Sequence, residues 1–509
     1  MLLFRFYLLV FLVVLAIWWP IKFLVSWFLY KRRATKLTKN ILKIDDYPLV
    51  GCGFRFMGKN NEEILDTLKD LCNNKTPFVG WFGPQSFVVI DHPDEIQTVM
   101  NAKGCIEKSL LYNFFNRGIG LFAAPAAIYK VQRKQLAASF SNPITWSFLP
   151  IFNQKANSLV RNVSQHVGKG HFDIMHLSSC CTLDIVCESV LGTNMKIQDG
   201  ENLDYMEALA EWLSAVARRM VNIFLHPDFI YKLTQSYQIE CNWSARSSVM
   251  PKKMISEKMK EFYENNNVDA IDDDENNQKI ERPQIFINRL MKLHSKGLVT
   301  DQEIRDQVDL IIFGGHDTSA FTAAVTILML AMHSKVEQRV MDELNDVLGD
   351  HPADDDLTMD QINQMTYLEQ VIRETLRLYP VAPVLLRHCT EDTEVENYVV
   401  PAGSEVIISA ITAHRRKDIW GPDADEFNPD HFSKEEMAKR SPYAFMAFSN
   451  GTRYCLGQRF AFISIKVVLA KLIRKYRITT HLGMDDIKFR FEVTCKPING
   501  IMVEVEERK

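Results

Sequence analysis

The sequence predicts a mainly α-helical protein with a smaller β part, built as a single large domain behind an N-terminal transmembrane helix. Apolar patterns with helical spacing follow Thr300 and extend from Gln458 to about Tyr476. Two pairs of short β-prone runs, at 78–90 and 398–410, are separated by Gly- and Pro-containing turns. The length alone would suggest about three domains. However, no Pro/Gly/Ser-rich linker and no internal repeat divides the chain, so we expect one large domain.

The composition is ordinary for a folded protein. The 509 residues are 47% hydrophobic and 24% charged, with a net charge of -4, which allows a large core. No basic excess points to nucleic acid as a partner. Ten cysteines are spread along the chain without a short framework of paired spacings, which favours reduced thiols on a cytosolic face.

The first 30 residues are the most apolar part of the chain. Residues 6–21 carry no charge, and 23–30 continue apolar after Lys22. Because about 20 apolar residues span a bilayer, we expect a membrane anchor at 1–30. A cleaved signal peptide is the alternative, but no small-x-small cleavage motif follows the apolar run.

A basic segment follows the expected anchor and contains Lys31, Arg32, Arg33, Lys36 and Lys39. Under the positive-inside rule this side of the anchor lies in the cytosol. We therefore expect an anchor at 1–30, a basic and turn-rich linker at 31–50, and one folded domain at 51–509 on the cytosolic side.

One loop near the C-terminus, residues 448–457, has the composition of a site that positions one cysteine sulfur toward a ligand. Gly451 can adopt a positive φ, and Gly457 lets a flat ligand approach the backbone. Arg453 could pair with an anion, and Cys455 lies just before a helix, where backbone N–H groups favour a thiolate. No Cys or His at zinc spacing accompanies Cys455. The alternatives are a thiolate ligand for iron or a buried structural cysteine.

A second segment interrupts a strong helical pattern. The helical pattern begins with a capping box formed by Thr300 and Glu303. Gly314 and Gly315 then place two poor helix formers inside the pattern. A bulge at this point would make room for a small ligand and turn the Thr318 hydroxyl inward. The alternative is a kink filled by polar side chains without any chemistry.

Two helical pairs complete the candidates. Tyr129 and Arg133 lie four residues apart on one helix face and could hold a carboxylate, although Arg133 alone would be a solvated charge. Glu374 and Arg377 lie three apart and can form a local ion pair. Neither pair is specific by itself.

The loop that carries Cys455 resembles the haem-binding loop of the cytochrome P-450 superfamily, the haem-thiolate monooxygenases. Its pattern is met in full by Phe448, Gly451, Arg453, Cys455 and Gly457. The resemblance implies the cytochrome P-450 fold and a non-covalent haem b whose iron is ligated by Cys455. It further implies that Arg133 and Arg387 bind haem propionates. Asp317 and Thr318 would relay protons during dioxygen activation.

The sequence is most similar to the branch of fatty-acid ω-hydroxylases and insect microsomal enzymes, but it departs from the family at three positions. Tyr129 stands where the family usually has Trp, and His431 stands where an Arg usually joins the buried pair of Glu374 and Arg377. Gly314 replaces the Glu that some members esterify to haem, so no such ester is expected.

The resemblance also implies partners and a location. Electrons would come from NADPH through a separate NADPH-cytochrome P-450 reductase, because no Gly-rich nucleotide motif is present, and cytochrome b5 would be a further partner. The enzyme would be a single-pass protein of the endoplasmic reticulum membrane, acting on a lipophilic small molecule. The aromatic segment 212–237 would roof the substrate channel, and the polar segment 264–283 would be a solvated loop.

Two other functions remain as alternatives. The first is a non-catalytic haem or hydrophobic-ligand binder on the same scaffold, and the second is a haem-thiolate isomerase or dehydratase that needs no reductase. Asp317, Thr318 and Cys455 are all present, which favours the monooxygenase.

Overall fold

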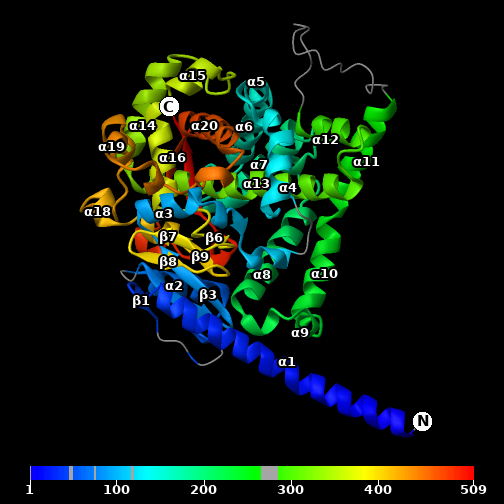
Figure 1. Ribbon diagram of the computed structural model, residues 1–509. Helices are drawn as coiled ribbons and strands as arrows, with labels where there is room; N and C mark the ends of the chain where they lie inside the picture. The colour runs from blue at the N-terminus through cyan, green and yellow to red at the C-terminus, as the bar shows by residue number, and fades with distance from the viewer. Residues whose placement is uncertain are drawn as a thin grey trace, which may run out of the picture.

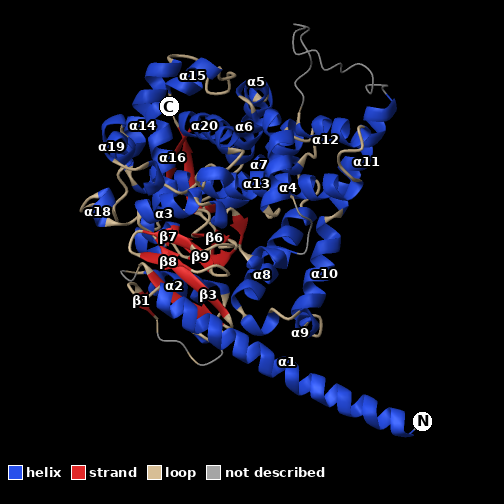
Figure 2. Cartoon of the chain, viewed as in Figure 1, coloured by secondary structure: helices blue, strands red, loops and turns tan. Residues whose placement is uncertain are grey.

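The computed structural model describes residues 2–44, 47, 50–73, 76–115, 120–264 and 285–508. Helices form most of this protein; the large sheet lies near α1 and α2, and further strands lie among the helices near the C-terminus (Figure 2). The expected mainly α fold with a smaller β part is confirmed. Residues 45, 46, 48 and 49 of the expected linker, and 265–283 of the expected polar loop, lie outside the described residues.

The α-helices are α1 (Leu2–Leu37), α2 (Asn61–Cys72), α3 (Pro93–Asn101), α4 (Ala126–Leu136), α5 (Asn142–Ser147), α6 (Leu149–Ser164), α7 (Ile174–Ser189), α8 (Asp204–Val221), α9 (Asp228–Tyr231), α10 (Gln235–Ser247), α11 (Val249–Glu264), α12 (Phe286–Ser295), α13 (Asp301–Met332), α14 (Ser334–Leu348), α15 (Met359–Gln364), α16 (Thr366–Leu378), α17 (Ala410–Ala413), α18 (Lys417–Trp420), α19 (Lys434–Lys439) and α20 (Gln458–Lys475). Short 3-10 turns that matter below are η2 (Lys103–Cys105), η6 (Ile223–Leu225), η7 (Pro429–Phe432) and η9 (Gly451–Arg453).

The strands are β1 (Leu42–Lys43), β2 (Phe78–Phe82), β3 (Gln85–Ile90), β4 (Glu107–Lys108), β5 (Phe172–Asp173), β6 (Val384–His388), β7 (Thr393–Val395), β8 (Tyr398–Val400), β9 (Glu405–Ser409), β10 (Tyr476–Thr479), β11 (Phe489–Glu492), β12 (Thr494–Pro497) and β13 (Met502–Glu507). The largest sheet has the order β1-β2-β3-β9-β6-β4. Its β2–β3 hairpin turns at Gly83, which has a φ of 61°. Both β-prone regions predicted from the sequence are therefore strands.

Helix α13 runs through the helical part of the protein and packs closely along α7 (Figure 1). The predicted capping box is present, because the Thr300 hydroxyl accepts from the Glu303 N–H and the Glu303 carboxylate accepts from the Thr300 N–H. The predicted bulge is wrong, since the helix continues unbroken from Asp301 to Met332. Gly315 serves the packing instead: a Cβ there would lie 2.8 Å from Cγ2 of Val186 on α7.

Helix α1 extends away from the body, with the N-terminus at its far end (Figure 1). Its C-terminal part is docked on the large sheet, where the Tyr30 hydroxyl lies 2.6 Å from the Ser86 hydroxyl and Trp27 contacts Trp81 edge-on. In the body of the protein, α13 is long and apolar enough to cross a membrane by length and composition. However, 72% of its apolar stretch is buried within the protein, as in a core helix.

Candidate active site

The loop that carries Cys455 is held in shape by its own backbone. The Cys455 N–H donates to the Phe448 carbonyl across 2.9 Å, which closes the loop just before α20 begins. Gly451 has a φ of 65°, and a Cβ there would lie 2.6 Å from the carbonyl oxygen of Met100 on α3. Only glycine fits at this contact, so α3 and the loop can touch backbone to backbone.

The Cys455 side chain is exposed. Even so, the protein packed around Cys455 raises the pKa of its thiol above the ordinary value, because burial disfavours the charged thiolate. Gly457 borders open space as well, since no heavy atom lies within 4 Å of where its Cβ would be.

The net direction of the pKa shift at Cys455 differs from the one predicted from its place before a helix. The N–H groups of Gly457 and Gln458 and the charge of Arg133 do lower the pKa, as expected, but burial outweighs them. The surrounding protein therefore does not by itself favour the thiolate. A bound metal cation would add that stabilisation, because a coordinated thiol loses its proton.

Helix α13 offers a second open surface. Gly314 is exposed although the residues around it line the core, and nothing lies within 4 Å of its missing Cβ. The Thr318 hydroxyl donates to the Gly314 carbonyl across 2.8 Å, so it lies over the open turn. The space for a small ligand that we expected from a bulge therefore arises because Gly314 has no side chain.

Asp317 points to a different element. Its buried carboxylate contacts the Lys496 ammonium and accepts from the Thr494 hydroxyl at 3.0 Å, both on β12. Burial lowers the pKa of Lys496 to about 7. The neighbouring His316 is also buried, and its pKa falls to about 3, first through burial and then through the charge of Lys496, so His316 is neutral.

Arg453 is buried and only partly satisfied. It donates from Nε to the Ile106 carbonyl at 3.2 Å and from Nη2 to the Ala124 carbonyl at 2.7 Å, and its guanidinium stacks 3.8 Å from the centre of the Tyr129 ring. Its Nη1 is buried without a hydrogen-bond partner among the described residues. Burial lowers the pKa of Arg453 to about 10.

Arg133 repeats this arrangement, and Arg387 is a further buried arginine beside the loop. Arg133 donates from Nη1 to the Tyr454 carbonyl at 3.2 Å, while its buried Nη2 lacks a partner within the described residues. Arg387 is 2% exposed and reaches the Ser449 hydroxyl at 3.3 Å, beside the Cys455 loop. Burial lowers the pKa of Arg387 too.

A fourth basic residue, Lys108, was not predicted from the sequence. Lys108 lies opposite Arg387 in the antiparallel pairing of β4 with β6. Burial and the charges of Arg387 and Arg453 hold the pKa of Lys108 well below its ordinary value. Lys108 is an inconspicuous residue in a two-residue strand, and only the pairing with a strand some 280 positions later makes it part of the site.

Arg133, Arg387, Arg453 and Lys108 form what we call the cation cluster. None of the four makes an ion pair with a carboxylate of the described residues. Buried charges are costly unless an opposite charge compensates them. The unpaired guanidinium nitrogens therefore suit a ligand that brings carboxylates of its own, and haem, with two propionates, fits this donor set.

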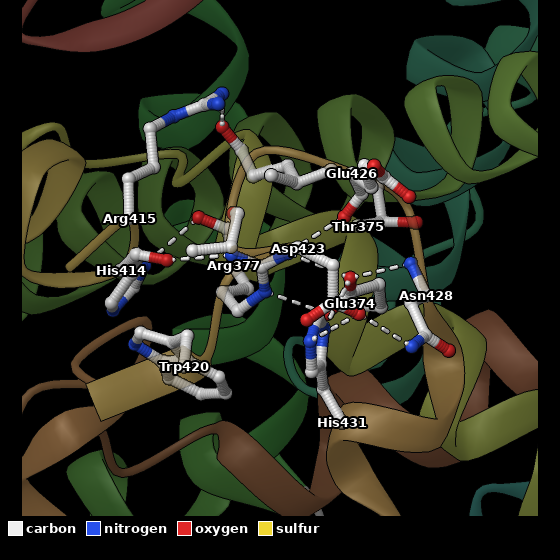
Figure 3. A network of polar contacts seen from close by, with 12 residues as sticks. Glu374, Thr375, Arg377, His414, Arg415, Trp420, Asp423, Glu426, Asn428 and His431 are labelled. Atoms are coloured by element: carbon white, nitrogen blue, oxygen red, sulfur yellow. Dashed lines mark hydrogen bonds and ion pairs between the residues drawn. The ribbon is translucent and has the colours of Figure 1, made fainter. Parts of the chain in front are cut away.

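The scaffold behind the loop is a network centred on Glu374 (Figure 3). Its carboxylate binds Arg377 through Nε at 2.7 Å and Nη2 at 2.8 Å. The His431 Nδ1 lies 3.0 Å from Glu374 Oε1, and its Nε2 lies 3.3 Å from Asp423 Oδ2. His431 thus occupies the third position of the network: its Nδ1 hydrogen-bonds to Glu374, while its Nε2 lies near Asp423 without a hydrogen bond among the described residues.

His414 connects this network to the thiol loop. The Arg377 Nη1 donates to the His414 carbonyl at 2.7 Å, and the His414 Nε2 accepts from the Met446 N–H at 2.8 Å. Burial, followed by the charge of Arg377, lowers the pKa of His414 to about 3, so the ring is the neutral acceptor that Met446 needs. No local pattern in the sequence pointed to His414.

Comparison with known proteins identifies the family. The family model described as Cytochrome P450 matches residues 45–505. Cytochrome P450 4c21 of Blattella germanica is 32% identical over 91% of this chain and 92% of its own length. Cytochrome P450 4c3 of Drosophila melanogaster is 29% identical over 94% of this chain and 92% of its own length. Human Cytochrome P450 4V2 is 29% identical over 84% of this chain and 82% of its own length. The predicted resemblance to this family and to its insect members is confirmed, and the chain belongs to the cytochrome P450 family of monooxygenases.

Proposed function

We propose that the protein is a membrane-bound haem-thiolate monooxygenase. It would insert one atom of dioxygen into a lipophilic small molecule, with electrons from NADPH through a separate reductase. The observation that carries the proposal is an exposed Cys455 in a loop beside Arg133 and Arg453, each of which has a buried guanidinium nitrogen without a partner among the described residues.

Cys455 would be the protein ligand of the haem iron. When bound, haem supplies the activation of dioxygen, and a thiolate ligand favours cleavage of the O–O bond. Arg133, Arg387 and Arg453 would hold the propionates, with Lys108 beside them. Gly457 would let the flat macrocycle approach the backbone, while Gly451 keeps the loop against α3 and Phe448 fixes its start against the ring of Phe462, 5.2 Å away.

Asp317 and Thr318 would move protons in the open turn of α13. The Thr318 hydroxyl is half-buried and bonded to the Gly314 carbonyl, so it can accept a proton and pass one on without leaving its position. Asp317 would act through a change of partner, because its carboxylate is held by Lys496 and Thr494.

Two features support attachment to the endoplasmic reticulum membrane by a single pass. Helix α1 carries the apolar stretch that precedes the basic residues 31–39. Exposed apolar side chains gather around η6 and α9, namely Phe224, Phe229, Ile230 and Leu233. Both features lie beside β2, since Phe82 contacts His226 next to η6 and Trp81 contacts Trp27 of α1. Together they would place the domain against the cytosolic leaflet.

The test is turnover of the reconstituted protein. The full-length enzyme, NADPH, an NADPH-cytochrome P-450 reductase and a panel of lipophilic substrates should yield oxygenated product, and omission of the reductase or NADPH should abolish it. Cytochrome b5 can be added as a second electron donor. Haem binding without product on any substrate would favour the non-catalytic binder, and product without NADPH would favour an isomerase or dehydratase.

A further inference from the structure

Two cysteines lie in contact behind the cation cluster. The Sγ atoms of Cys105 and Cys389 are 3.0 Å apart, although the residues are 284 positions apart in the chain. Cys105 ends η2 just before β4, and Cys389 follows β6 directly. These are the two strands that pair Lys108 with Arg387. The thiols are 1% and 0% exposed, so this contact belongs to the core of the fold.

The surroundings of the pair are polar and asymmetric. The Thr393 hydroxyl lies 3.2 Å from the Cys389 sulfur and 3.6 Å from the Cys105 sulfur. A hydrogen bond from Cys389, and then Thr393 and the charge of Arg387, lower the pKa of Cys105, while the same contact raises the pKa of Cys389. Cys105 therefore ionises more readily than Cys389, and Cys389 is placed to attack it once it is oxidised.

Other buried cysteines have a different environment. Cys187 on α7 is fully buried, and burial with the nearby Asp184 carboxylate raises the pKa of its thiol. Its sulfur has no hydrogen bond to another thiol within the described part of the chain. Cys187 is thus an internal control for a buried thiol without a partner.

We propose that Cys105 and Cys389 form an oxidation site that hydrogen peroxide converts to a disulfide, which links η2 to the end of β6. The Cys105 thiolate attacks one peroxide oxygen, the O–O bond breaks, and a sulfenic acid and one water form. The Cys389 sulfur then displaces the hydroxyl group, so the S–S bond forms and a second water leaves. Each sulfur loses one electron and the peroxide gains two.

The bond requires little movement. A disulfide has an S–S distance of about 2.05 Å, so the sulfurs must approach each other by about 1 Å. The link would join the chain segments that carry Lys108 and Arg387 and so restrict their separation. This inference concerns the scaffold of the proposed haem-carboxylate site and does not depend on which substrate the enzyme oxidises.

The experiment maps thiols in the full-length holoenzyme. After a brief treatment with hydrogen peroxide the protein is denatured, alkylated with N-ethylmaleimide, digested and analysed by mass spectrometry with and without a reductant. We expect a reducible peptide that joins Cys105 to Cys389, together with loss of alkylation at both, while Cys187 stays alkylated. Equal alkylation of all three cysteines, or a different cross-link, would overturn the proposal.

Two variants test the roles within the pair. In Cys389→Ser the sulfenic acid on Cys105 should persist and react with dimedone, whereas in Cys105→Ser dimedone should not label Cys389. Cys187→Ser is the matched control and should form the cross-link as the unmodified protein does. Dimedone labelling of Cys389 in Cys105→Ser, equal to that of Cys105 in Cys389→Ser, would contradict the assignment of Cys105 as the reacting thiol.

Discussion

The Lys496 ammonium lies against the Asp317 carboxylate and joins the C-terminal hairpin to α13. The hairpin is tight, because a single residue, Val493, separates the paired residues Glu492 and Thr494. Val493 has a φ of 68°, which is unusual for a β-branched residue. Such strain persists only where the surrounding contacts impose it. The hairpin therefore fixes the position of the carboxylate that we propose as a proton donor.

Loss of Lys496 should impair both the stability of the fold and the coupling of NADPH consumption to product formation. Lys496→Met leaves a buried carboxylate unpaired, which costs about 3 kcal/mol of unfolding free energy, and should lower the product formed per NADPH. Lys496→Arg should retain much of both, and the exposed neighbour Lys488→Met is the control. Denaturant unfolding and NADPH-to-product ratios measure the two effects. A Lys496→Met protein with unchanged coupling would show that the pair does not position Asp317.

Thr318→Ala should separate haem binding from proton delivery. The variant keeps the helix and the haem, but electrons should pass to hydrogen peroxide because the hydroxyl over the Gly314 turn is missing. Thr326→Ala is a matched control, since the Thr326 hydroxyl makes the same bond to the carbonyl four residues earlier, at 2.7 Å. Peroxide and product are measured in parallel. Tight coupling in Thr318→Ala would remove Thr318 from the relay.

His431 should stabilise the scaffold through its two carboxylate contacts. His431→Ala leaves Glu374 with one fewer partner, and we expect a loss of about 2 kcal/mol in unfolding free energy. His431→Arg restores a bidentate donor and should be better tolerated. The exposed Lys434→Ala is the control. If His431→Ala unfolds at the same denaturant concentration as the unmodified protein, the contact between His431 and Glu374 contributes nothing to stability.

Glu95 on α3 should make stability depend on pH. It is 2% exposed, accepts from the Tyr398 hydroxyl at 3.0 Å, and its other oxygen has no partner in the described residues. Burial raises the pKa of Glu95 from 4.5 to about 7. The folded state therefore keeps a proton that the unfolded state loses. The corresponding stability is fully present below pH 4.5 and declines, by up to about 3 kcal/mol, as the pH rises to about 7 and above.

Glu95→Gln should remove this dependence. Its melting temperature should exceed that of the unmodified protein by more at pH 8 than at pH 5, while the exposed Glu394→Gln should behave alike at both. A difference that is the same at both pH values would mean that Glu95 is already ionised in the folded protein at pH 5.

Local patterns in the sequence predicted the local structure well. The capping box at Thr300, the β2–β3 hairpin and the helix of Arg133 each depend on residues within a few positions of one another, and all three are present. The bulge at Gly314 was wrong, because the α-helical pattern tolerates two glycines when α7 packs against one of them.

Long-range pairing could not be predicted in the same way. Lys108, Lys496 and His414 become part of the site only through partners on distant strands and helices. The spread of cysteines predicted reduced thiols, but it gave no reason to join Cys105 with Cys389. The direction of the Cys455 pKa shift also depends on burial, which a helix N-terminus in the sequence does not reveal.

The most direct test of the central claim is the difference spectrum of the reduced protein with carbon monoxide. The unmodified protein and Cys241→Ala, which changes an exposed cysteine on α10, should both show the red-shifted Soret band of a thiolate-ligated haem. Cys455→Ala should lack it. A band that survives in Cys455→Ala, or that is absent from the unmodified protein after haem loading, would contradict the assignment of Cys455 as the iron ligand.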